Sequence, residues 1–97
     1  MRIISRAAIA EFTARSDRKD ALEALLHWYA VARRAKWRHL ADVRRDFPHA
    51  DAVGMFTVFN IGGNKYRLAA AIKYRWQIVY IRNILTHVEY DGGGWKS

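Results

Sequence analysis

Two arginines, a histidine and a tyrosine in the second half of the chain could together perform acid–base chemistry on a phosphate. Arg67 and Arg82 each lie in a run typical of a β-strand, and His87 and Tyr90 come directly after the second run. A guanidinium group can donate two parallel hydrogen bonds to a phosphate, while an imidazole and a phenol can exchange protons with a reacting oxygen. These four residues are therefore the candidate catalytic residues.

This set of groups suits the cleavage of RNA without a metal ion. RNA supplies its own nucleophile, the ribose 2′-hydroxyl, so the protein must remove that proton, stabilise charge around phosphorus and protonate the 5′-oxygen. The chain has no cysteine, and its histidines do not show the spacing of metal ligands. We expect neither a metal nor a cofactor.

The charge of the chain favours a polyanionic partner. Its 97 residues include 17 Lys and Arg against nine Asp and Glu, which gives a net charge of +8, and its pI is about 10.3. Such a surplus attracts nucleic acid or an anionic membrane. The stretch from Ala52 to Thr86 holds five basic residues and no acidic one. They are Lys65, Arg67, Lys73, Arg75 and Arg82.

Length and composition indicate one cytoplasmic domain. Residues 1–91 are expected to fold as a single unit, with a flexible glycine-rich tail over residues 92–97. No apolar run reaches 18 residues and no apolar segment of signal-peptide length follows Met1, so we expect no membrane association and no export. The absence of cysteine suits a reducing compartment.

The first pair of strands is predicted from an alternating pattern that begins at Met55. Gly62-Gly63-Asn64 supplies residues that accept positive φ and predicts a hairpin turn. A two-residue turn at Gly62-Gly63 or at Gly63-Asn64 places Asn60 on the same face as Lys65 and Arg67. A three-residue loop would reverse that relation.

A second hairpin is predicted to bring Arg82 to the same face. If Arg75-Trp76 is a two-residue turn, the strand from Gln77 to about Leu85 places Arg82 opposite Ala69. Small side chains at Ala69 and Ala71 would leave a shallow trough between the basic groups. The alternative is that a helix covers this face.

The motif Thr86-His87-Val88-Glu89 predicts the start of a short helix. Threonine at the cap and glutamate three residues later form a capping box, with His87 in the first helical position. Backbone N–H groups at the start of a helix also attract anions.

Polar and aromatic residues around the predicted face are expected to bind RNA. They are Lys36, Trp37, Asn60, Asn64, Lys65, Lys73 and Thr86. Trp37 has two interpretations. Between Lys36 and Arg38 it could stack on a base, but its helical spacing with Leu40 and Val43 favours the core.

The first half of the chain is predicted to be helical support. Ser5 is a candidate N-cap for a helix over Arg6–Ala14, and a second helix is expected to begin after Ser16 or Asp17 and to reach about Ala35. The predicted buried stripe of the second helix is Leu22, Leu25, Leu26, Tyr29 and Ala32.

The predicted architecture is α+β. A third helical piece should run from about Trp37 to Phe47, ending before Pro48, and Ile3-Ile4 is expected to form an edge strand. Two or three N-terminal helices would then pack on one face of a small antiparallel sheet, leaving the other face basic and partly open.

Three segments carry a resemblance to a known family. VFNIGGNKYRL (58–68), YIR (80–82) and THVEYD (86–91) resemble the signature of the HigB family of toxins within the RelE-like ribonuclease superfamily. The opening MRIIS (1–5) and AKW (35–37) agree with it.

This resemblance implies a microbial-ribonuclease-like sheet and a toxin that cleaves mRNA, commonly on translating ribosomes. It also implies a HigA-type antitoxin with a helix-turn-helix domain, in a complex that represses its own operon, so that operator DNA is contacted only through that complex. The family pattern falls on Asn60, Gly62, Asn64, Lys65, Arg67, Arg82, Thr86, His87, Tyr90 and Asp91. Arg67 and His87 are the foremost of these.

Two other functions fit parts of the pattern. One is a non-catalytic RNA- or ribosome-binding module on the same fold, since His87 is the only convincing general base. The other is a DNA-binding component that uses Arg33, Arg34, Arg44 and Arg45 beside an antitoxin.

Overall fold

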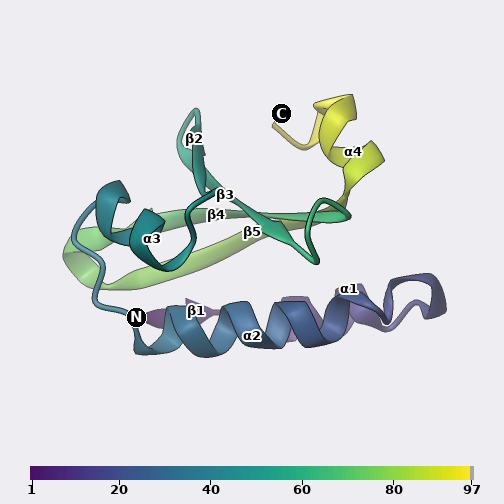
Figure 1. Cartoon of the computed structure of the whole chain (residues 1–97), viewed down its shortest axis with the longest axis horizontal. Coiled ribbons are helices and arrows are strands. Elements are labelled where there is room, and N and C mark those ends of the chain that lie inside the picture. Colours follow the sequence, from purple (N-terminus) through teal and green to yellow (C-terminus); the bar gives the residue numbers. More distant parts are fainter. Residues whose placement is uncertain (97) are drawn as a thin grey trace.

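A five-stranded sheet forms the centre of the computed structural model, which describes residues 1–96 (Figure 1). The strands follow the order β1-β5-β4-β3-β2, with β1 parallel to β5 and the other neighbours antiparallel. Their bounds are β1 Arg2–Ile4, β2 Asp51–Val53, β3 Phe56–Ile61, β4 Tyr66–Lys73 and β5 Ile78–Thr86. The α+β class and the edge strand at Ile3-Ile4 are confirmed, whereas β2 was not predicted.

Four α-helices surround the sheet: α1 Ala7–Thr13, α2 Ala21–Arg34, α3 Leu40–Asp46 and α4 His87–Gly92. Figure 1 shows α1 and α2 along one face and α4 on the other side, at the end of the sheet away from the N-terminus. Short 3-10 turns occupy Ser16–Arg18, Tyr74–Trp76 and Gly94–Lys96. No helix within residues 1–96 is both long and apolar enough to cross a membrane.

The core between the helices and the sheet is built around Phe59. Its ring is fully buried and lies 5.4 Å from Trp28, 6.2 Å from Trp37 and 5.2 Å from Phe47, measured between centroids. Three edge or stacked aromatic contacts of this kind add to the free energy gained by burying the ring area. Phe59 therefore joins α2, α3 and β3 into one unit.

The buried stripe of α2 differs from the predicted one. Its fully buried residues are Ala21, Leu25, Trp28 and Ala32, which recur at the spacing of one helical face. Leu22 and Leu26 are 40% and 36% exposed, so their predicted burial is wrong. The prediction failed because it assigned the buried face to the large apolar side chains of leucine and left out Ala21 and Trp28.

Helices α1 and α3 are shorter than predicted. Helix α1 follows Arg6 and has no side-chain cap, so the predicted Ser5 cap is wrong. Helix α3 begins only at Leu40, after an extended His39. The predicted continuous piece from Trp37 to Phe47 is therefore wrong at its start.

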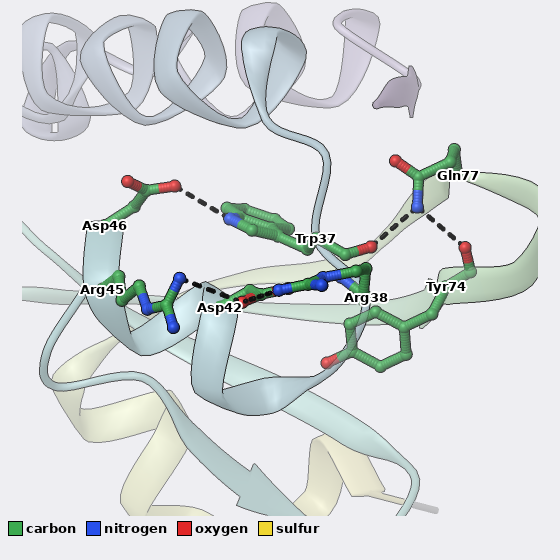
Figure 2. Close-up of polar contacts among 7 residues, drawn as sticks. All are labelled: Trp37, Arg38, Asp42, Arg45, Asp46, Tyr74 and Gln77. Carbon is green, nitrogen blue, oxygen red and sulfur yellow. Dashed lines mark hydrogen bonds and ion pairs between the residues drawn. The ribbon is translucent and has the colours of Figure 1, made fainter.

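Trp37 belongs to the core. It is 2% exposed, and its indole Nε1 donates a hydrogen bond of 2.9 Å to Asp46 (Figure 2). No open face is left for a base to stack on, which rules out the stacking interpretation. The adjacent Arg38 donates from its backbone N–H and its guanidinium to Asp42, which also pairs with Arg45.

The hairpin registers confirm one half of the predicted face and correct the other. Asn60 lies opposite Arg67, as a Gly63-Asn64 turn requires. The second hairpin keeps the predicted register as far as Ala70 opposite Ile81, but Ala69 then pairs with Asn83. Arg82 is thus the extra residue of a β-bulge and does not lie opposite Ala69.

The C-terminal turn packs on the sheet. Trp95 stacks on Tyr90 at 5.4 Å, contacts Phe56 at 5.7 Å and donates a hydrogen bond from Nε1 to the Tyr90 carbonyl. The tail predicted for residues 92–97 thus contains a 3-10 turn at Gly94–Lys96, its flexibility stays a prediction, and Ser97 lies outside the described residues.

Replacing Phe59 by alanine should strongly destabilise the fold. We expect Phe59→Ala to lower the free energy of unfolding by about 3–5 kcal/mol, because a buried aromatic ring is replaced by a cavity. Trp76→Ala, at a site 66% exposed, should change it by less than about 0.5 kcal/mol. Denaturant unfolding measures both, and equal losses would contradict the central place of Phe59.

The bonds to Asp42 should make stability depend on acid pH. Arg38 lowers the pKa of Asp42 to about 2, first through its guanidinium and then through its backbone N–H. A lowered folded-state pKa stabilises the protein above the unfolded value of 3.8, and this contribution is lost as pH falls through the folded value. Asp42→Asn should therefore be less stable than the native chain at pH 7. The two should converge between pH 3.8 and about 2. A constant difference across that range would contradict this assignment.

Candidate active site

Arg67 is held in place by oxygen atoms of its own hairpin. Its Nη1 donates to the carbonyls of Asn64 and Tyr66, both at 3.1 Å, and its Nη2 donates to Asn64 Oδ1 at 2.8 Å. The Gly62–Lys65 turn creates this arrangement, because Gly62 and Gly63 adopt positive φ and return the chain so that Asn64 faces β4. Asn64, predicted as a turn residue and as an RNA-binding residue, thus also holds Arg67 in place.

The charge of Arg67 has no carboxylate partner among residues 1–96. The residue is 8% exposed, and all three oxygen contacts are to uncharged groups. A buried cation without a counter-ion is costly, and a bound anion would offset that cost. Arg67 is therefore a candidate for binding an anionic group on the sheet face opposite α1 and α2.

The capping box brings His87 to this arginine. Thr86 accepts from the Glu89 N–H, and Glu89 accepts from the Thr86 N–H, so α4 begins where predicted. The backbone bond from Thr86 is also the chief reason why the pKa of Glu89 is lowered. The His87 N–H then donates to the Lys65 carbonyl at 2.9 Å, which fixes the start of α4 against the hairpin turn.

The imidazole of His87 bridges Arg67 and Asp91. Its Nδ1 lies 3.5 Å from Arg67 Nη2, and its Nε2 lies 3.0 Å from Asp91 Oδ2. A guanidinium can only donate, so the contact with Arg67 is attractive when Nδ1 carries the lone pair. The proton then sits on Nε2 and is donated to Asp91. This tautomer presents an unprotonated nitrogen next to a fixed positive charge.

Aromatic rings connect this pair to Arg82. The Arg67 guanidinium lies over Tyr90 at 5.4 Å, and Tyr90 stacks on Trp95. Trp95 contacts Phe56, over which Arg82 lies at 5.8 Å. We call this series Arg67–Tyr90–Trp95–Phe56–Arg82 the cation–aromatic row. Aromatic rings next to cations are features that bind the bases and backbone of single-stranded nucleic acid.

Arg82, at one end of the cation–aromatic row, lines two cavities. Arg82 lines a cavity of about 490 Å³ with Trp95 and Lys96, and another of about 630 Å³ with Lys73 and Tyr80. The predicted site residue Lys73 is therefore near Arg82 and not part of the Arg67–His87 pair. The predicted shallow trough is not open at Ala69, because Ala69 is 0% and Leu85 is 8% exposed.

The remaining predicted RNA-binding residues lie in several places. Asn60 is exposed opposite Arg67 and remains available on that face. Lys65 is paired with Asp20 at 3.1 Å, and the Thr86 hydroxyl is occupied as the cap of α4. Lys36 lies beyond α2, beside the buried Trp37, and is not part of the cation–aromatic row.

Two residues of the site, Phe56 and Trp95, were not among the candidates, and Asp91 was named only as part of the family pattern. Asp91 follows His87 by four residues, the spacing of neighbours on one helix face, so its pairing could have been inferred. Phe56 and Trp95 could not, because their contact depends on the chain turning back after α4. The residues that the structure brings together are thus Asn64, Arg67, His87, Tyr90 and Asp91.

Known proteins are similar to most of this chain. Residues 21–93 match the HigB_toxin family, the RelE-like toxic component of a toxin-antitoxin system. The mRNA interferase HigB of Escherichia coli O6:H1 is 33% identical over 94 residues, covering 94% of this chain and 89% of the relative. The mRNA interferase toxin HigB of Escherichia coli K12 is 50% identical over 34 residues.

The K12 match covers 35% of this chain and spans only 33% of that relative's length. The family match spans the hairpin turn, Arg67 and the segment from Thr86 to Asp91, and the O6:H1 match covers nearly the whole chain. This chain therefore belongs to the HigB toxin family, RelE-like toxic components of toxin-antitoxin systems.

Proposed function

We propose that this chain is an endoribonuclease toxin that cleaves mRNA through the substrate's own 2′-hydroxyl. The observation that carries the proposal is a buried Arg67 without a carboxylate partner within residues 1–96, next to the imidazole of a His87–Asp91 pair. Its family relatives named mRNA interferase support the same activity.

In this mechanism His87 is the general base. Nδ1 gives up its long contact with Arg67 Nη2 and takes the proton of the 2′-hydroxyl, and Asp91 stabilises the imidazolium that forms, as the carboxylate does in a catalytic triad. The 2′-oxygen attacks phosphorus, the bond to the 5′-oxygen breaks, and the products are a 2′,3′-cyclic phosphate and a 5′-hydroxyl end. Arg67 stabilises the charge that develops on the phosphate oxygens. Tyr90, under Arg67, donates the proton to the leaving 5′-oxygen.

The substrate is an unpaired stretch of mRNA. The rings of the cation–aromatic row are partly exposed and Arg82 is exposed, so the accessible ring atoms would contact bases while Arg82 contacts a phosphate. Nucleotides next to the cleaved bond would follow this row toward Arg82, with Asn60 as a further polar contact. A strand in the A-form duplex would keep its bases stacked inside and could not use the rings.

We place this activity in the cytoplasm, under the control of an antitoxin. The family description names a toxin-antitoxin system, and the family resemblance points to a HigA-type antitoxin with a helix-turn-helix domain. In that arrangement the antitoxin blocks access to Arg67 and carries the contact with operator DNA. The ribosome is the expected place of cleavage, since translated mRNA is presented there as an extended single strand.

Substitution of Arg67 or His87 should strongly slow cleavage without loss of the fold. We expect Arg67→Ala to slow cleavage of a single-stranded RNA by about a hundredfold to a thousandfold, as when one transition-state donor is removed. His87→Gln should slow it by about a hundredfold or more. The native protein should keep its rate in EDTA.

Arg75→Ala is the matched control, because Arg75 is exposed and its guanidinium contacts only Trp76 among the described residues. It should cleave at the native rate. Native-rate cleavage by both site variants would refute the assignment. RNA binding without any new 5′ ends, even with ribosomes present, would favour the non-catalytic RNA-binding module instead.

Two substitutions of Asn64 separate anchoring from charge. Asn64→Ala removes a hydrogen bond to a charged group, worth about 1.5–3 kcal/mol, and should slow cleavage by roughly tenfold to a hundredfold. Asn64→Asp keeps a hydrogen-bond acceptor but supplies Arg67 with a counter-ion. It should therefore cleave RNA no faster than Asn64→Ala does. Restoration of the native rate by aspartate would show that the uncompensated charge of Arg67 is unimportant. Single-turnover rates measure the difference.

A further inference from the structure

A second basic site lies at the end of the molecule away from α4. A cavity of about 650 Å³ opens where β1 begins and α2 ends, and it is lined by five cationic side chains. They are Arg2, Arg33, Arg34, Lys36 and Arg38, which we call the basic notch. Figure 1 shows the N-terminus and the end of α2 at one end of the long axis and α4 at the other. The basic notch is thus separate from the Arg67–His87 pair.

Most of the charge in the basic notch is uncompensated. Arg38 is paired with Asp42 (Figure 2), but within residues 1–96 no ion pair or side-chain hydrogen bond engages Arg2, Arg33, Arg34 or Lys36. Elsewhere the surface cations Arg15, Arg44 and Lys65 each have a carboxylate partner. Four cations without a carboxylate partner among residues 1–96 therefore line one cavity.

The end of α2 does not use these side chains. The amino group of Met1 donates to the carbonyls of Arg33 and Ala35 at 2.8 and 2.7 Å, and more weakly to that of Ala32. Burial and the nearby Lys36 lower the pKa of this amino group, as expected where cations crowd together. The amino group of Met1 thus occupies the carbonyls of Ala32, Arg33 and Ala35, and the cationic side chains are not held by them.

The chemistry of the basic notch differs from that of the cation–aromatic row. No aromatic residue lines it, since Trp37 faces the core. Cations without ring faces can grip phosphates but cannot stack on bases. Such contacts suit a duplex, whose bases are stacked inside and whose phosphates are presented at regular intervals.

We propose that the basic notch binds the sugar–phosphate backbone of a double-stranded RNA segment while a separate single strand occupies the Arg67–His87 site. The choice of RNA over DNA rests on the proposed function, whereas the recognition of a duplex backbone rests on the notch alone. The toxin would then hold a structured RNA at one end and cut an unpaired strand at the other.

The test is the affinity of the full chain for a short blunt-ended RNA duplex, measured by fluorescence anisotropy over a range of salt concentrations. Arg34→Ala should lower the slope of log K against log salt by about one, and Arg34→Glu should weaken binding by about tenfold. Lys19→Glu is the control, because it changes the net charge by the same amount as Arg34→Glu. Lys19 is exposed and lies before α2. This variant should bind nearly as the native chain does.

Cleavage of a short single strand distinguishes this proposal from the proposed function. Arg34→Glu should cleave it at the native rate, and His87→Gln should bind the duplex at the native affinity whether or not the chain is a nuclease. Equal duplex affinity of Arg34→Glu and Lys19→Glu would overturn the proposal. So would a loss of single-strand cleavage in Arg34→Glu, or equal competition by a DNA duplex or by polyglutamate.

Discussion

The anchoring of Arg67 by the Gly62–Lys65 turn is the constraint on which the rest of the site depends. A guanidinium buried to 8% exposure must be satisfied, and here Asn64 and the backbone of Tyr66 satisfy it with neutral oxygens. Hydrogen bonds to neutral groups fix its direction but leave its charge available. A carboxylate in the place of Asn64 would hold the side chain equally well and would compete with any bound phosphate. The turn therefore explains both the geometry and the charge of the site.

The short helix α4 supplies the proton-transfer group to this fixed charge. Six residues would not form a stable helix alone, so α4 depends on its capping box and on bonds to other parts of the chain. These include the bond from His87 N–H to the Lys65 carbonyl and the ion pair of Glu89 with Arg18. The same contacts that stabilise α4 thus determine where the imidazole lies. Asp91, one turn later, fixes its ring.

Local patterns in the sequence predicted much of this arrangement. The capping box at Thr86, a hairpin turn within Gly62-Gly63-Asn64 and the placement of Asn60 on the face of Arg67 all follow from neighbouring residues, and they are confirmed. The β-bulge at Arg82 could not be predicted, because the residues of β5 alone do not determine which of them is left unpaired. The burial of Trp28 and the packing of Trp95 on Phe56 depend on contacts between distant segments. The basic notch likewise appears only when β1 and the end of α2 are brought together.

The central claim is that Arg67 and His87 act on a phosphate attacked by its own ribose. The chemistry of the RNA ends tests it most directly, with a single-stranded substrate carrying either ribose or 2′-deoxyribose at the cleaved position. The structure predicts a 2′,3′-cyclic phosphate and a 5′-hydroxyl from the ribose substrate, and no cleavage at the deoxyribose. A 5′-phosphate product, or cleavage that persists at the deoxyribose, would contradict the account.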